Sequence, residues 1–250
     1  MMKENIALIT GASRGIGAAT AKLLAQQNLH IIVHYHKNKV AALTVVKHII
    51  EHGGSAQAIQ ADISQPSDIV NLFNQIDQIN GKLTMLVNNA GILFQQSTIE
   101  NLSAERINKV LSTNVTGSIL CCKEAVKRMA IKYGGKGGSI VNVSSAASRL
   151  GAPGEYIDYA ASKGAIDTLT TGLSLEVAEQ GIRVNGVRPG LIYTEIHADG
   201  GEPNRVDRLS NNIPMKRGGQ PEEVAQAIVW LLSEKASYVT GSHIDLAGGK

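Results

Sequence analysis

Residues 6–17 read IALITGASRGIG, an apolar run that passes directly into a glycine-rich turn. The run IALIT is typical of a buried strand, and the alanine-rich segment after the turn predicts a helix. Glycines at 11, 15 and 17 permit a tight turn, close approach of backbone to a ligand, and close helix–strand packing. A helix N-terminus supplies free N–H groups and partial positive charge, which suit a pyrophosphate. The stretch therefore predicts a nucleotide site, although its GxxxGxG spacing differs from the usual GxGxxG of dinucleotide-binding turns.

The alternation of strand and helix patterns continues along the whole chain. Apolar runs at 6–10, 30–35, 56–60, 83–88, 139–144 and 182–187 predict strands, and a short strand is expected near 242–246. Helical patterns lie at about 15–28, 39–52, 66–80, 103–132, 158–180 and 221–233. Buried runs without polar alternation favour a parallel sheet covered on both faces. We therefore expect one doubly wound α/β domain over residues 1–250.

Composition excludes several classes of function. The 250 residues carry a net charge of +3, and their basic residues are scattered, which argues against nucleic acid as a partner. No apolar segment approaches the length of a membrane span, and the first residues offer too short an apolar run for a signal peptide. The adjacent Cys121 and Cys122 are expected to be buried as small apolar residues, in a reducing and hence cytoplasmic compartment. We expect no metal site.

Tyr159 and Lys163 stand four residues apart, so on a helix their side chains share a face. A phenol has an ordinary pKa of about 10, and a neighbouring cation would lower it toward neutrality by favouring the phenolate. Ser145, fourteen residues before Tyr159, has a hydroxyl suited to bind a substrate oxygen. These three residues predict proton transfer to or from an oxygen. A tyrosine–lysine pair at this spacing is also common on helix surfaces.

The residues after the second strand indicate which dinucleotide binds. An acid at this place would accept the adenosine ribose hydroxyls and repel a 2′-phosphate. The segment reads His34-Tyr35-His36-Lys37-Asn38 and contains no acid. Together with Arg14 in the glycine loop, this favours NADP(H) over NAD(H). An alternative is that His36 and Lys37 are merely solvated residues at a strand end.

Further motifs extend the pattern to the whole chain. TGASRGIG at 10–17, Asp62, NNAG at 88–91, Asn114, Ser145, YAASK at 159–163 and PG at 189–190 together resemble the short-chain dehydrogenase/reductase (SDR) family. The resemblance implies a single-domain Rossmann fold with a seven-stranded parallel sheet, assembled as a homotetramer through the helices at 103–132 and 158–180. It also implies an NADP(H)-dependent oxidoreductase that interconverts a carbonyl and an alcohol of a small molecule. Members similar to this sequence include glucose 1-dehydrogenases and 3-oxoacyl-acyl-carrier-protein reductases.

The resemblance assigns roles to individual residues. It makes Tyr159 the acid or base, Lys163 the cation that lowers its pKa, Ser145 the group that orients the substrate oxygen, and Asn114 the holder of a relay water. The implied cofactor-binding residues are Gly11, Ser13, Arg14, Gly15, Ile16, Gly17, Tyr35, His36, Lys37, Asp62, Ile63, Asn89, Ala90, Gly91, Tyr159, Lys163, Pro189, Gly190, Ile192 and Thr194.

Several of these assignments have alternatives. Asn114 is also suited to break or cap a long helix, and Asp62 to cap the helix that begins near Pro66. Ser144 is adjacent to Ser145, and the two should point to opposite sides of a strand; the NxSS pattern of the family favours Ser145. Tyr156 is a second phenol, but only Tyr159 has a lysine four residues on.

The segment 191–215 is where the family covers its substrate. Glu155, His197 and Arg205 are candidates to contact a polar substrate, and the polar character of the segment favours a hydroxylated or sugar-like one. A different class of function is a regulator that senses NADP(H) without chemistry. Such proteins usually lack the tyrosine or the lysine, and both are present here.

Overall fold

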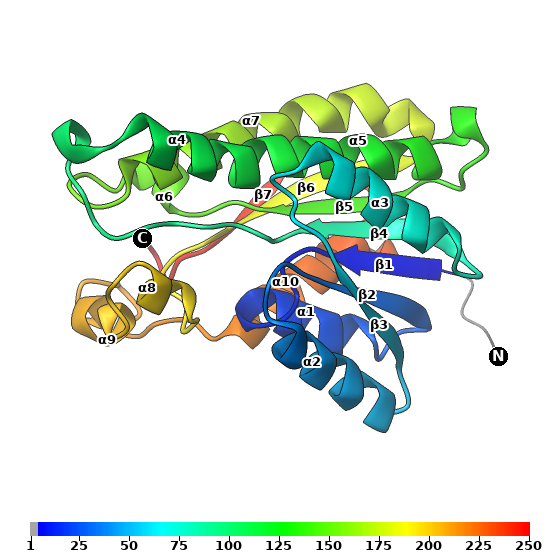
Figure 1. Ribbon diagram of the computed structural model, residues 1–250, viewed down its shortest axis with the longest axis horizontal. Coiled ribbons are helices and arrows are strands. Elements are labelled where there is room, and N and C mark those ends of the chain that lie inside the picture. Colours follow the sequence, from blue (N-terminus) through cyan, green and yellow to red (C-terminus); the bar gives the residue numbers. More distant parts are fainter. Residues whose placement is uncertain (1–4) are drawn as a thin grey trace.

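The computed structural model describes residues 5–250, in which seven parallel strands form one sheet in the order β3-β2-β1-β4-β5-β6-β7 (Figure 1). Residues 1–4 of the expected domain lie outside the described residues. The strands are β1 (Asn5–Ile9), β2 (Leu29–Tyr35), β3 (Ser55–Gln60), β4 (Lys82–Asn88), β5 (Gly138–Val143), β6 (Ile182–Pro189) and β7 (His243–Leu246). The predicted doubly wound parallel sheet is confirmed.

Helices cover both faces of this sheet. One apolar core joins it to α1 (Gly15–Leu24), α2 (Lys39–Glu51) and α10 (Pro221–Leu232). A second core joins the other face to α3 (Pro66–Asp77), α5 (Ser118–Met129) and α7 (Ile157–Val177), and α4 (Ala104–Leu111) precedes α5 on this side (Figure 1). Aliphatic side chains fill both cores. Pro66 and Pro221 begin their helices as expected, because a first-turn proline loses no helical hydrogen bond.

The strand order places a crevice at one edge of the sheet. The chain turns to one side from β1 through β2 to β3, then crosses by α3 to β4 on the other side of β1. The loops that leave the carboxyl ends of β1 and β4 therefore diverge. Ligands of open α/β sheets bind in the crevice that this reversal creates.

The expected single helix over 103–132 is interrupted. Between α4 and α5 the backbone forms a π-helical segment, η2 (Ser112–Gly117), that contains the buried Asn114. Such π segments accommodate an extra residue in a helix and are frequent at functional sites. The helix continues in the same direction, so the asparagine widens it rather than ending it.

Segment 191–215 contains two short helices that periodicity did not predict. They are α8 (Ile196–Asp199) and α9 (Arg205–Ser210), and both lie beyond the carboxyl ends of the strands (Figure 1). A further short helix, α6 (Ala147–Leu150), follows β5. An isolated bridge between Ile192 and Gly219 closes the base of the segment. These short elements form a cover over the crevice.

Candidate active site

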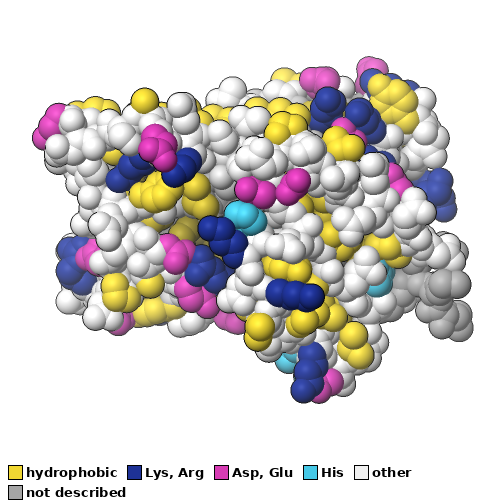
Figure 2. Space-filling model, viewed as in Figure 1, with side chains coloured by type: hydrophobic (Ala, Val, Ile, Leu, Met, Phe, Trp, Pro, Cys, Tyr) yellow, Lys and Arg dark blue, Asp and Glu magenta, His cyan; other side chains and the backbone are white. Residues whose placement is uncertain are grey.

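The crevice opens into a cavity of about 1660 Å³. This is larger than the roughly 300–1,000 Å³ of ordinary small-molecule pockets, so it has room for a dinucleotide and a substrate together. Figure 2 shows a hollow on the left of this face, with hydrophobic side chains inside it and charged side chains around it. Its lining includes these predicted residues: Gly11, Ser13, Arg14, Gly15, Ile16, His36, Lys37, Asp62, Ile63, Asn89, Ala90, Gly91, Ser145, Tyr159, Lys163, Pro189, Gly190, Ile192 and Thr194.

Three predicted residues do not line the cavity. Tyr35 is 5% exposed and belongs to the core between the sheet and its helices, so its assignment to the cofactor is wrong. Because side chains alternate along a strand, the neighbouring His34 and His36 face the cavity instead. Gly17 and Asn114 lie behind the lining, where they support residues that reach it.

The glycine loop is shaped by close backbone approach. Gly11 and Gly15 have φ angles of 62° and 51°, in the left-handed region that favours glycine. A Cβ atom on Gly11 would lie 2.9 Å from the Cα of Ala90, and one on Gly17 would lie 2.5 Å from the carbonyl oxygen of Gly11. Side chains at these positions would push the loop off its neighbours. The sequence therefore specifies a bare backbone surface at the start of α1.

Hydrogen bonds join this loop to the one after β4. The side chain of Asn89 donates to the carbonyls of Thr10 and Gly11 at 2.9 and 3.0 Å. The Thr10 hydroxyl accepts from the backbone N–H groups of Asn89 and Ala90, both at 3.0 Å. No side chain caps the first N–H groups of α1. This fixed cradle of open donors fits a pyrophosphate.

His34 is a supporting residue that the sequence reasoning missed. The residue is 1% exposed, and its Nδ1 accepts the backbone N–H of Gly11 at 3.0 Å. Nδ1 is thus unprotonated, so Nε2 carries the hydrogen and donates to the carbonyl of Ala61 at 3.0 Å. Burial lowers the pKa of His34 to about 4. A histidine at a strand end suggests a solvated residue, and only the alternation of side chains along β2 hinted otherwise.

Where β2 and β3 end, the cavity is lined by three predicted residues with ionisable side chains, His36, Lys37 and Asp62. His36 Nε2 lies 3.5 Å from Asp62 Oδ2, and Lys37 is exposed beside them. The carboxylate of Asp62 accepts the N–H of Ser64 at 2.9 Å in the turn before α3, whose N-cap is Gln65, so the capping alternative is wrong. The end of β2 bears no acid, and a basic pair faces the cavity.

Arg14 contacts α8, one of the short helices that cover the crevice. Its guanidinium forms an ion pair with Asp199 of α8, and each side chain is about half exposed. An exposed pair of this kind contributes little to stability and exchanges readily with other anions. Arg14 is therefore accessible to a phosphate in the cavity at the expense of its contact with Asp199.

The residues that the sequence predicts to transfer a proton line the same cavity. The Ser145 hydroxyl lies beside the Tyr159 phenol and accepts the N–H of Ala147 at 3.1 Å. The hydroxyl of Ser144 instead donates to the carbonyl of Lys163 at 3.1 Å and is buried. Of the two adjacent serines, Ser145 is thus the one beside Tyr159. The rival phenol, Tyr156, donates to the carbonyl of Gly200 at 3.4 Å.

Lys163 is buried behind the phenol. Its Nζ donates to the carbonyl of Val143 at 2.7 Å and lies 5.5 Å from the centre of the Tyr159 ring. A Cβ atom on Gly91 would be 3.5 Å from this Nζ and 3.4 Å from the Oδ1 of Asn114. A side chain at position 91 would fill the space between these polar groups, so glycine keeps it open.

The side chain of Asn114 is fully engaged. Its Oδ1 accepts the N–H of Ile92 at 2.8 Å, and its Nδ2 donates to the carbonyl of Ile92 at 2.9 Å and to the hydroxyl of Ser162 at 3.0 Å. These bonds tie the π segment to the loop after β4 and to α7. Asn114 therefore fixes the spacing between Gly91 and the helix that carries Lys163.

The electrostatics differ from the sequence-based expectation. Burial raises the pKa of Tyr159 to about 12, and the hydrogen bond with Ser145 only partly opposes this. Burial also lowers the pKa of Lys163 to about 8, against the carboxylate of Asp167, which raises it. The expected lowering of the Tyr159 pKa by Lys163 is absent from this arrangement, because desolvation dominates at the phenol. Near neutral pH both groups hold their protons.

The candidate substrate contacts are largely paired with one another. Arg205 forms ion pairs with Glu155 and with Glu202, the latter at 2.8 Å, and lies over the ring of Tyr156. His197 Nε2 bonds to the carbonyl of Ile192 at 2.9 Å, and burial lowers the pKa of His197. The cavity is also lined by apolar side chains, among them Leu93, Phe94, Leu150, Ile196, Leu209 and Ile213. The polar lid therefore gives little support to a sugar-like substrate.

Comparison with known proteins gives extensive matches. A family model described as enoyl-(acyl carrier protein) reductase matches residues 11–250. The uncharacterized oxidoreductase YgfF of Escherichia coli (strain K12) is 71% identical over 98% of this chain and 99% of its own. Glucose 1-dehydrogenase 2 of Bacillus subtilis (strain 168) is 37% identical over 97% of this chain and 93% of its own. A crystal structure of a short chain dehydrogenase from Burkholderia cenocepacia J2315 in complex with NADP has a TM-score of 0.89 and 30% identity, covering 99% and 98% of the two chains.

Proposed function

The chain belongs to the short-chain dehydrogenase/reductase family of oxidoreductases, and we propose that it reduces a carbonyl to an alcohol with NADP(H), using Tyr159 as the acid. The carrying observation is the joint placement of Tyr159, Ser145 and Lys163 on a cavity that begins at the glycine cradle. A bound nicotinamide would supply or accept the hydride. The protein's own groups bind, orient and move the proton.

The proton chemistry follows from the state of Tyr159. The phenol keeps its proton at neutral pH, because burial raises its pKa to about 12. As a carbonyl oxygen gains charge it becomes more basic than a phenolate, so the proton of Tyr159 transfers to it. The Ser145 hydroxyl would donate to the same oxygen, and the ammonium of Lys163 would stabilise the phenolate that remains. This assignment favours reduction as the direction of use at neutral pH.

The preference for NADP(H) rests on the charged end of the cavity. Arg14, His36 and Lys37 face the place where an adenosine ribose would lie when its pyrophosphate sits on the cradle at α1. A 2′-phosphate there would take Arg14 from its exposed pair with Asp199. The similar structure from Burkholderia cenocepacia J2315, described as a complex with NADP, supports the same choice.

The substrate we propose is a small or medium-sized carbonyl compound with an apolar portion. Leu93, Phe94, Leu150 and Ile196 offer apolar surface on the substrate side, while the charges of Glu155 and Arg205 satisfy one another. Burying an isolated charge against these paired groups would be costly. An uncharged ketone, quinone or acyl chain thus fits the lining better than a polyol does.

A spectrophotometric screen tests the function. NADPH consumption is followed with short ketones, quinones, acyl thioesters and sugars, and NADH is compared at equal concentration. We expect turnover with an apolar carbonyl and a preference for NADPH. Turnover only with NADH would contradict the argument from Arg14, and sugar oxidation alone would contradict the proposed substrate class. Tight binding of NADPH without turnover of any compound would instead favour a cofactor sensor.

A further inference from the structure

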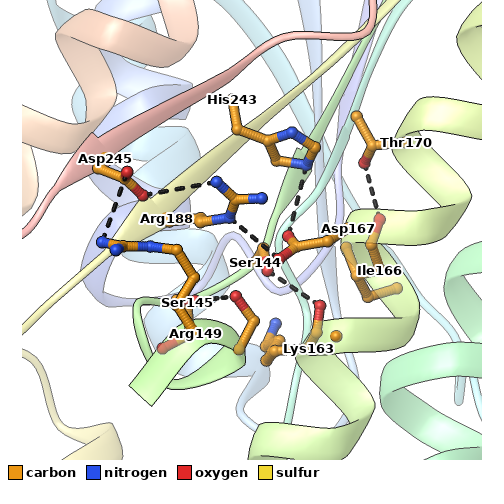
Figure 3. Close-up of polar contacts among 12 residues, drawn as sticks. Ser144, Ser145, Arg149, Lys163, Ile166, Asp167, Thr170, Arg188, His243 and Asp245 are labelled. Atoms are coloured by element: carbon orange, nitrogen blue, oxygen red, sulfur yellow. Dashed lines mark hydrogen bonds and ion pairs between the residues drawn. The ribbon is translucent and has the colours of Figure 1, made fainter. Parts of the chain in front are cut away.

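A partly buried charge network lies one helical turn beyond Lys163. Asp167 follows Lys163 by four residues on α7, so the two side chains share a face of the helix. Its Oδ2 accepts from the Nε of Arg188 on β6 at 3.0 Å, and its Oδ1 faces the Nε2 of His243 on β7 at 3.4 Å. Figure 3 shows the carboxylate between these two groups. Three elements thus converge on one partly buried acid.

The site that holds Asp167 is formed by strands β6 and β7. The ring of His243 packs on Gly186 of β6, where a Cβ atom would lie 2.4 Å from the Cδ2 of His243. Glycine in this strand therefore makes room for the imidazole. Within residues 5–250, neither Asp167 Oδ1 nor His243 Nε2 has a hydrogen-bond partner, although both are buried. Asp167 Oδ1 is thus held in place without a hydrogen-bond donor, so its negative charge is not fully compensated.

The network continues outward with charges of alternating sign. Arg188 also faces Asp245 at 3.8 Å, and Asp245 faces Arg149 of α6 at 3.4 Å (Figure 3). Arg188 therefore divides its charge between two acids and compensates Asp167 only in part. Arg149 lies four residues after Ser145, so the same network connects the segment of the serine to the helix of the lysine.

The surroundings of Lys163 make this charge important. Lys163 is 4% exposed, and its Nζ has a neutral partner in the carbonyl of Val143. An ammonium in such a site loses its proton easily unless an anion compensates it. The charged and titratable groups on the elements packed around it include Tyr159, Asp158 and Asp167 on α7, Arg106 on α4, Arg149 on α6, Arg188 on β6, and His243 and Asp245 on β7.

Most of these groups are paired away from Lys163. Asp158 is neutralised by Arg106, whose Nε lies 2.7 Å from its carboxylate. Asp167 lies one turn from Lys163 on the same face of α7, and its negative charge raises the pKa of the ammonium. We propose that Asp167, held by Arg188 and His243, is a positioning residue that keeps Lys163 protonated beside Tyr159. Its part in the reaction rests on the proposed function, whereas its effect on the lysine does not.

Asp167→Asn tests the effect on Lys163 without substrate or cofactor. The protein is labelled briefly with acetic anhydride across a pH series, and the acetylation of the peptide containing Lys163 is measured by mass spectrometry. The wild-type midpoint is expected at about 8. The substitution should lower it by about one pH unit, because the amine loses its counter-charge. Asp167→Glu keeps the charge and should leave the midpoint in place.

Two further variants separate a charge effect from a structural one. Asp158→Asn removes a different carboxylate of α7, which is buried and paired with Arg106, and should not move the Lys163 midpoint. Arg188→Gln removes the cation that shares the charge of Asp167, so the midpoint should rise. Because the midpoint is expected to move in the opposite direction from that in Asp167→Asn, Arg188→Gln still tests the proposal if Asp167→Asn does not fold. Equal midpoints in wild type and Asp167→Asn, or a fall with Arg188→Gln, would overturn the proposal.

Measurements of activity then show whether the effect of Asp167 on the pKa of Lys163 matters for the reaction. The alkaline limb of the reductive kcat should move with the labelling midpoint in each variant. A limb that stays fixed while the midpoint moves would overturn the part of Asp167 in the reaction. If Tyr159→Phe retained full turnover, the proposed function would fail, and the labelling result would still stand by itself.

Discussion

Tyr159 and Lys163 respond to burial in opposite directions, and this gives the two directions of the reaction different pH profiles. In the mechanism we propose, reduction needs the phenol and the ammonium both protonated, and Lys163, with a pKa of about 8, loses its proton first. The reductive kcat should therefore fall as pH rises through about 8. Oxidation needs the phenolate, so its rate should rise with pH, by up to about tenfold per unit. Initial rates in both directions from pH 6 to 10 measure this, and parallel profiles would contradict it.

Substitution of the phenol tests its role directly. Tyr159→Phe removes the acidic proton and leaves the ring in place, so NADPH binding should change little. The value of kcat should fall by about 10²–10⁴-fold, the usual contribution of a general acid. Binding is measured by fluorescence titration and turnover with the best substrate of the screen. Tyr156→Phe is the matched control, since its hydroxyl bonds to the carbonyl of Gly200 and not to Ser145. Normal turnover of Tyr159→Phe would contradict the mechanism.

His34 couples the cofactor cradle to the stability of the fold. Its pKa falls from 6.5 to about 4 on folding, so the unfolded chain binds the extra proton between these values. Stability present above pH 6.5 is then lost as pH falls toward 4, by on the order of 3 kcal/mol. His34→Leu should abolish this part of the pH dependence and raise the KM for NADPH about 5- to 30-fold, because the N–H of Gly11 loses its acceptor.

His34→Asn serves as the control for that substitution. Its amide oxygen can accept from Gly11 where Nδ1 does, while it titrates at no pH. The KM should stay close to that of wild type, and the slope of stability between pH 6.5 and 4 should disappear as in His34→Leu. Urea denaturation at several pH values measures the slope. A wild-type slope in both variants would show that other groups are responsible.

At the scale of elements, much of the architecture was predictable. Each strand predicted from an apolar run is present, with ends that differ by at most two residues, because buried parallel strands need continuous apolar sequence. The glycines of the cradle and the Tyr159–Lys163 pair also came from local spacing, whereas the choice of Ser145 over Ser144 came from the family resemblance. The Asp167 network did not, since its members lie on α7, β6 and β7 and meet only in the folded sheet. The raised pKa of Tyr159 could not be predicted from the sequence either, because residue spacing does not reveal burial.

The π segment makes a prediction of its own. Gly117 passes over the loop after β3, and a Cβ atom there would lie 2.5 Å from the carbonyl oxygen of Ile63. Gly117→Ala should therefore destabilise the protein by roughly 1–3 kcal/mol, since two backbone segments must separate. Gly172→Ala on α7 is the control: nothing lies within 4 Å of its Cβ position, so it should stabilise by roughly 0.5–1 kcal/mol. Urea unfolding compares the two, and equal effects would contradict the clash.

At the scale of the whole molecule, α5 and α7 run side by side on one face of the sheet (Figure 1). Their outward surface includes exposed apolar side chains, among them Ile119 and Leu175, the latter 77% exposed. Contact with another subunit would cover such exposed apolar side chains. They lie within the two segments that the sequence analysis assigned to the interfaces of a homotetramer, which we keep as a prediction.

Light scattering coupled to gel filtration tests this assembly. The wild-type chain should have the mass of a tetramer, built from two kinds of two-fold contact. Leu175→Lys places a charge in the expected interface and should reduce the mass to that of a dimer or monomer. Val40→Lys is the matched control, because Val40 is also 77% exposed but lies on α2, on the opposite face of the sheet. A tetramer in both variants would exclude the α7 surface, and a wild-type monomer would exclude the assembly itself.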